Sequence, residues 1–190
     1  MSSPFGSWSS PFSPASVAAS SPRIDGAAFV GDEIWWGESV PDERGRVTVR
    51  SSTGDMILPG PWSARSRVHE YGGGAWAADA EGTLYFVDGS DQRVRRMPRG
   101  GPLLPLTPAG PAYGGLRLAG GRLFAVREDL ESEPHMRAIV EIPLDGSAGD
   151  DPALLRTVVE GPDFYAHPAL SPDGSRVAWV EWSADRMPWQ

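Results

Sequence analysis

The sequence predicts an all-β fold built from repeated units, and three observations carry that prediction. Short apolar strands alternate with tight turns from residue 23 to residue 190. Glycine and proline are frequent, at 23 and 19 residues, and they follow no collagen-like period, which indicates many turns. No window longer than a couple of turns shows the 3.6-residue periodicity of an amphipathic helix, so strands must supply the core.

One strand–turn–strand pattern occurs four times. An apolar strand, a turn and a second strand centred on an aromatic residue appear as AAFV-GD-EIWWGE, AWAA-DAEG-TLYFVD, LRLA-GG-RLFAVRE and PAL-SPDG-SRVAWVE. In Ser171–Gly174, proline pre-sets φ at the second turn position and glycine tolerates a positive φ. Aligning the second strands places four residues in one column, Ile34, Leu84, Leu123 and Val177. Their irregular spacing is typical of propeller blades with loops of variable length.

Third and fourth strands complete the first three units. They are GRVTVRSS and DMILP, then QRVRRMP and LLPLTP, then RAIVEIPL and ALLRTVVEG. The predicted fold is a partial β-propeller of about three and a half four-stranded blades that does not close. We expect blades near residues 23–62, 63–110 and 111–161, and a truncated fourth blade at 162–190. The aromatic residues of the second strands are expected in the core between blades: Trp35, Trp36, Tyr85, Phe86, Phe124 and Trp179.

Residues 1–22 have a different composition. They are rich in Ser, Pro and Ala, with Phe5, Trp8 and Phe12 spaced along them. Composition alone allows either a disordered tail or an extended arm whose aromatic side chains dock on a neighbouring surface.

Composition also excludes several classes of function. The net charge of −8 opposes a nucleic-acid partner, which would need a basic surface to meet phosphates. There is no cysteine, and His69, His135 and His167 are too scattered for a metal site, so we expect neither a metal nor a cofactor. No segment has the roughly 20 apolar residues of a membrane helix and the N-terminus is unlike a secretory signal. We therefore expect no membrane partner and a cytoplasmic location.

Several stretches resemble one family, the acylaminoacyl-peptidase and dipeptidyl-aminopeptidase branch of the prolyl oligopeptidases. They are PFGSWSSPFSP at 4–14, RSRVHEYGGGAWA at 65–77, FAVRED at 124–129, DFYAHPALSPDGSRVAWVEW at 163–182 and DRMPW at 185–189. The resemblance implies a propeller that caps an α/β-hydrolase domain carrying Ser, Asp and His and that gates the access of peptides to it. It also implies that residues 4–14 dock on that domain.

The hydrolase half is missing from this sequence, which contains no G-x-S-x-G nucleophile elbow. No catalytic residue can therefore be assigned, and we expect no catalysis from this chain alone. Its expected partners are a peptide substrate in the full enzyme and the missing hydrolase domain. One alternative is a stand-alone interaction propeller that closes its ring by oligomerising. A metal-dependent hydrolase with its site on the propeller axis ranks last, because corresponding strands show no repeated Asp, Glu or His.

The stretch Arg65–Gly74 is the most distinctive part of the sequence. Three consecutive glycines lie beside four polar-tipped side chains, Arg67, His69, Glu70 and Tyr71. In one hypothesis Glu70 faces the catalytic domain and binds the free amino terminus of a substrate. The other hypothesis, which we favour, is a buried Arg–Glu or His–Tyr network that locks one blade to the next.

Overall fold

The computed structural model describes residues 4, 6–13, 16 and 21–186. Its strands form four antiparallel sheets, which we call blades 1 to 4. Blade 1 contains β1 (Ile24–Val30), β2 (Glu33–Val40) and β3 (Arg46–Ser51). Blade 2 contains β4 (Trp76–Ala78), β5 (Leu84–Val87), β6 (Val94–Met97) and β7 (Leu104–Pro105). Blade 3 contains β8 (Ala112–Ala119), β9 (Arg122–Glu128), β10 (Arg137–Ile142) and β11 (Arg156–Glu160), and blade 4 contains β12 (Phe164–Leu170) and β13 (Val177–Trp182).

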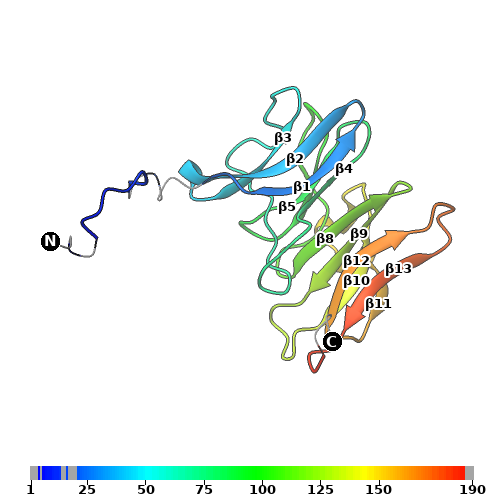
Figure 1. Ribbon diagram of the computed structural model, residues 1–190. Helices are drawn as coiled ribbons and strands as arrows, with labels where there is room; N and C mark the ends of the chain where they lie inside the picture. The colour runs from blue at the N-terminus through cyan, green and yellow to red at the C-terminus, as the bar shows by residue number, and fades with distance from the viewer. Residues whose placement is uncertain (1–3, 5, 14–15, 17–20, 187–190) are drawn as a thin grey trace.

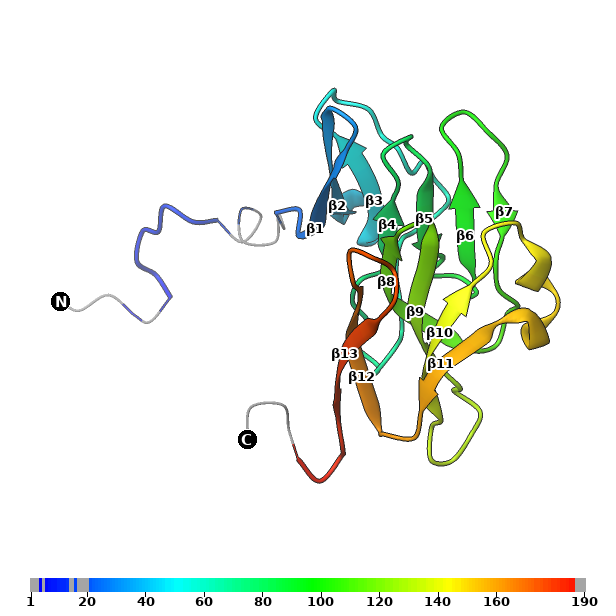
Figure 2. The same ribbon diagram turned by 90° about the vertical axis from the view of Figure 1, so that its right-hand side faces the viewer.

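The four blades follow one another as an open arc (Figure 1). The first strand of each blade lies beside the first strand of the next, so β1, β4, β8 and β12 form the inner side of the arc. Later strands of each blade lie progressively outward, as the turned view shows for β4 to β7 (Figure 2). The described residues form an all-β partial propeller that does not close, as the sequence predicts.

Blade 1 differs from the prediction in its fourth strand. The stretch DMILP at 55–59 forms no strand, and its ladder pairing with β3 is reduced to one isolated bridge between Arg50 and Met56. The chain reverses through a tight turn in which the Ser51 amide donates to the Asp55 carbonyl at 3.0 Å. Pro59 and Pro61 lack the amide hydrogens that a longer ladder would need, so pairing ends after one bridge.

The core lies between successive blades because each central strand packs both of its faces. Along β5, Leu84 and Phe86 pack against Trp35 of blade 1, whereas Tyr85 and Val87 pack against blade 3. This division follows from the two-residue period of a strand, whose successive side chains point to opposite faces. Trp35, Tyr85, Phe86 and Phe124 are buried and Trp36 and Trp179 are half-buried.

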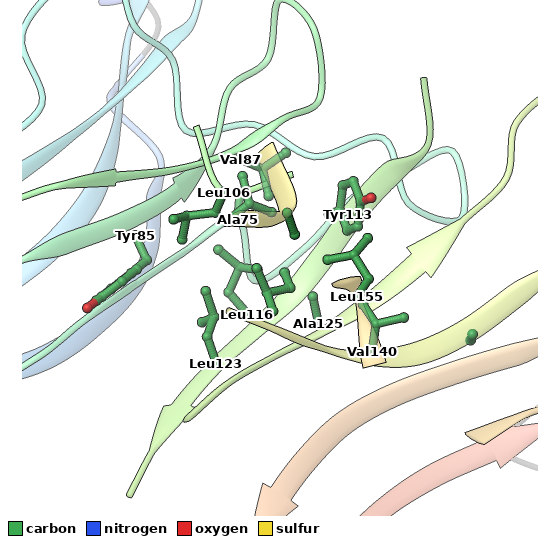
Figure 3. Packing of buried hydrophobic residues seen from close by; sticks show 14 residues of the cluster. Ala75, Tyr85, Val87, Leu106, Tyr113, Leu116, Leu123, Ala125, Val140 and Leu155 are labelled. Carbon is green, nitrogen blue, oxygen red and sulfur yellow. The ribbon is translucent and has the colours of Figure 1, made fainter. Parts of the chain in front are cut away.

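The buried apolar side chains of the described residues form three clusters, and the largest lies between blades 2 and 3. Figure 3 shows Tyr85, Val87 and Leu106 of the blade 2 side facing Leu116, Leu123 and Val140 of blade 3. Leu106, Leu123 and Val140 are fully buried. Burying a leucine or valine side chain stabilises a fold by about 1.5–3 kcal/mol, so this junction contributes much of the stability of the arc.

The two outer faces of the arc carry exposed apolar side chains. On blade 1, Phe29 is 84% exposed and Ile34, its cross-strand partner, is 45% exposed. On blade 4, Val180 is 48% exposed. These residues lie on strand faces opposite those that pack on a neighbouring blade, so each end of the arc presents a sheet face without a described partner.

The N-terminal segment runs away from the blades, as both ribbon views show for residues 6–13 (Figures 1 and 2). Trp8 and Phe12 are largely exposed, whereas Phe5 lies outside the described residues. Met187, Pro188 and Trp189 of the DRMPW motif also lie outside them.

Main-chain contacts join blade 2 to blade 3 on the inner side. The Gly115 amide donates to the Gly73 carbonyl at 2.9 Å and the Leu116 amide donates to the Gly74 carbonyl at 2.8 Å. A Cβ on Gly74 would lie 2.7 Å from the Cα of Gly115, so the two backbones approach more closely than side chains permit. The β8 strand is irregular at the same place, where its register shifts between Gly114 and Arg117.

We expect Gly74→Ala to destabilise the protein by about 3 kcal/mol, because a left-handed backbone costs alanine about 1–2 kcal/mol and overpacking costs a similar amount. Gly100→Ala is the matched control, since Gly100 also has a positive φ (+69°, against +55° for Gly74) but no described atom lies within 4 Å of the position that its Cβ would take. Urea unfolding of both variants measures the difference. Equal losses of stability would show that the close approach of Gly74 to Gly115 is unimportant.

Candidate functional site

The stretch singled out by the sequence forms a left-handed turn at the blade 2–3 junction. The Glu70 amide donates to the Arg67 carbonyl at 2.9 Å, and the Gly72 amide donates to the Val68 carbonyl at 2.8 Å. His69 and Glu70 have φ values of +55° and +70°. Residues other than glycine adopt a positive φ at a cost of about 1 kcal/mol or more each, so contacts elsewhere must hold the turn in place.

The four predicted side chains of this turn divide into one buried and three exposed. His69 is only 9% exposed, whereas Tyr71 is 78% exposed and Arg67 and Glu70 are also exposed. The structure therefore brings His69 into the junction but does not form a buried Arg67–Glu70 pair. The rings of His69 and Tyr71 lie 6.0 Å apart, so these two side chains remain in contact.

A buried carboxylate holds the turn. Glu128, at the end of β9, is fully buried, and its Oε2 accepts a hydrogen bond of 2.6 Å from the His69 backbone amide. Its Oε1 is paired with the Arg137 guanidinium and lies 3.2 Å from His135 Nδ1. Three partners thus satisfy a charge that would otherwise be costly to bury. Glu128 belongs to the FAVRED stretch, but its role depends on a contact 59 residues away that no local pattern reveals.

Aromatic rings from blade 4 enclose the His69 side chain. The Phe164 ring meets it edge-on at 5.3 Å and the Trp182 ring does so at 6.0 Å. Phe164 and Trp182 stack at 5.2 Å, and the Arg137 guanidinium lies 4.6 Å from the Phe164 ring centre. The turn is therefore fixed by blade 3 through Glu128 and by blade 4 through these rings.

A pocket of about 500 Å³ opens beside the turn, and we call it the inner pocket. Its walls are formed by Val68, His69 and residues 71–74 of the turn, the irregular part of β8 at 115–117, residues 165–169 of β12, Val126 and Trp182. The β12 wall is also irregular, with a register shift between Ala166 and Ala169 and a φ of +54° at His167. Irregularities of this kind are frequent beside binding sites because they re-aim side chains.

No group of three or more metal-binding side chains is placed together among the described residues. Within the same residues, no helix is long and apolar enough to cross a membrane. The arrangement of this site can bind a ligand through ring faces and polar tips, and it shows no nucleophile–base pair.

Burial lowers the pKa of His69 below its ordinary value of 6.5, the positive charge of Arg137 lowers it further, and only Glu128 opposes them. The unfolded chain therefore takes up this proton at a higher pH than the folded protein does. Stability from the neutral His69 is present above about pH 6.5 and is lost as the pH falls through the lower folded value.

We expect His69→Asn to flatten the dependence of unfolding free energy on pH between pH 7 and pH 5, since asparagine carries no titrating group and tolerates a positive φ. His167→Asn is the matched control, because His167 has nearly the same φ but an exposed side chain. Denaturant unfolding across this pH range measures both slopes. An unchanged slope in His69→Asn would contradict the assignment.

The comparisons with known proteins agree with this architecture. No family model matches the chain, and no curated protein matches it. Among solved structures, a puromycin-hydrolysing peptidase of Mycobacterium tuberculosis matches 98% of the chain with 40% identity and a TM-score of 0.88. A puromycin hydrolase matches the same share with 35% identity and a TM-score of 0.86, and a variant of that enzyme in complex with PGG gives 0.88.

The chain spans 32% of the length of each of these structures, about one third. Identities of 35–40% over nearly the whole chain, together with the same fold, indicate common descent. The motif resemblance is thus confirmed: the chain belongs to the prolyl oligopeptidase family and corresponds to the N-terminal portion of the peptidases that it matches.

Proposed function

We propose that this chain is the N-terminal propeller portion of a serine peptidase, in which the propeller gates the access of peptides to a Ser-Asp-His hydrolase domain. The observation that carries the proposal is the match of 98% of the chain to about one third of peptidases that hydrolyse puromycin. The open arc supports it, because its outer faces, with Phe29 and Val180 exposed, are suited to packing against further blades.

A ring of blades acts as a gate through its size. The first strands β1, β4, β8 and β12 line the inner side of the arc, so completion of the ring would leave a narrow axial channel. Short extended peptides pass such a channel and folded proteins do not. The segment with Trp8 and Phe12 would dock on the hydrolase domain, and the described blades would carry no catalytic group themselves.

The test is the activity of the protein encoded when the reading frame is followed past Gln190. We expect it to hydrolyse puromycin and short peptide amides, to lose activity when the serine of its G-x-S-x-G motif becomes alanine, and to leave folded proteins intact. The measurement is the kcat/KM for one cleavable sequence, presented as a short peptide and within a folded protein. Equal cleavage of both would refute the gate, and absence of hydrolysis would refute the peptidase.

The alternative, a propeller that closes by oligomerising, makes a different prediction from the same exposed faces. It requires a discrete oligomer of the 190-residue chain in solution, whose molar mass light scattering reports. A single chain that continues into further blades has no need of such an oligomer.

Within this function we propose that the turn Arg67–Tyr71 binds substrate, with the exposed Glu70 carboxylate pairing with the free amino group of a peptide. Its backbone geometry supports this role. Glu70 has a strained φ of +70° and an exposed carboxylate, and it lies in a turn that Glu128 holds in place. Backbone strain of this kind is frequent at ligand-binding positions.

We expect Glu70→Gln in the longer protein to lower kcat/KM about tenfold or more for peptides with a free amino terminus, since it removes a charge-assisted hydrogen bond. The same peptides with an acetylated amino terminus should be cleaved equally by both forms. Glu81→Gln, at an exposed hairpin position of blade 2, is the control. Unchanged kinetics on the free-amino peptides would leave Glu70 without this role.

A further inference from the structure

The inner pocket exists because its walls lack side chains where two backbones meet. Gly72, Gly73, Gly74 and Gly115 form a continuous part of its lining. The amides of Gly73 and Gly74 donate no hydrogen bond within the described part of the chain, so they remain available to an acceptor. Backbone amides presented by glycines are a common element of anion-binding sites.

The charge of the pocket contrasts with that of the molecule. The chain carries a net charge of −8, yet among the described residues that line the pocket the charged side chain is Arg117, and none of them is a carboxylate. Arg117 is exposed, and its guanidinium has no hydrogen bond or ion pair to any residue that the structure describes. Arg137 of blade 3, by contrast, is paired with the buried Glu128.

A second and independent observation concerns His69. Its Nε2 is buried and finds no hydrogen-bond partner in the described structure, although His69 forms one wall of the pocket. A buried ring nitrogen without a partner carries a cost that a bound polar group would relieve. The neighbouring walls are aromatic, because Tyr71 and Trp182 also line the pocket and both rings lie 6.0 Å from the His69 ring.

We propose that the inner pocket binds the carboxyl-terminal residue of a peptide. The carboxylate pairs with Arg117, the glycine amides complete its hydrogen bonds, and the peptide N–H of the terminal residue donates to His69 Nε2. An aromatic or large apolar side chain of that residue lies against Tyr71 and Trp182. A guanidinium binds a carboxylate through two parallel hydrogen bonds, and capture of a terminal carboxylate by backbone amides is a known mode of peptide recognition. Glu70 does not line this pocket, so the two proposed contacts are separate.

The proposal names a substrate feature of the proposed peptidase and so rests on that function, but its test needs no catalysis. The probes are N-acetyl-phenylalanine, its C-terminal amide and N-acetyl-alanine, titrated into the full-length protein by calorimetry or NMR. We expect the phenylalanine acid to bind about tenfold more tightly than its amide and clearly more tightly than the alanine acid.

The variant Arg117→Gln should abolish the preference for acid over amide while leaving the affinity for the amide unchanged. Arg176→Gln, an exposed arginine at the tip of the β12–β13 hairpin, is the matched control and should retain the preference. Far-ultraviolet circular dichroism of each variant establishes that it is folded.

Three results would overturn the proposal. The first is equal affinity for acid and amide in the unaltered protein, and the second is an unchanged preference in Arg117→Gln. The third is displacement of the phenylalanine acid by millimolar inorganic phosphate with no preference over the alanine acid, which would make the pocket a general anion site. If the full-length protein hydrolyses peptides but binds acid and amide equally, only the pocket assignment is wrong. If it prefers the acid but hydrolyses no peptide, only the proposed peptidase function is wrong.

Discussion

The inner side of the arc depends on one buried charge. Glu128 accepts the amide of His69 and is paired with Arg137, so a carboxylate at the end of β9 fixes both a turn of the preceding blade and a strand of its own blade. Removing one partner of such a buried pair generally costs about 3–5 kcal/mol, because the other charge is left without compensation. The left-handed backbone of His69 and Glu70 persists because this constraint exceeds its cost.

This constraint sets the positions of the side chains that are available to a ligand. The turn presents Glu70 and Tyr71 to solvent and places His69 against the Phe164–Trp182 stack. The glycines that follow lie so close to β8 that no side chain fills the space between them. A rigid support, a strained turn and an unfilled hollow are thus consequences of the same junction, which is the combination that binding sites require.

Much of the fold could be predicted from local pattern, and the site only in part. The two-residue alternation and the turns fix the strands, and Trp35 and Phe86 are buried between blades as their pattern indicates. The fourth strand of blade 1 was predicted wrongly because Pro59 and a tight turn override its apolar composition. The sequence stretch of the turn could be found by its composition. Glu128 could not, because burial and a partner 59 residues distant give it its role.

The nature of the junctions also determines how the arc can deform. Blades 2 and 3 share main-chain hydrogen bonds through Gly73 and Gly74, whereas polar contacts from blade 3 to blade 4 run through arginine side chains, with Arg137 reaching the Asp163 carbonyl and Arg122 the Gly174 carbonyl. Long side chains follow a displacement that a backbone ladder resists. We therefore expect blades 2 and 3 to move as one rigid body, and amide hydrogen exchange to be faster at the arginine-bridged junction before β12 than between blades 2 and 3.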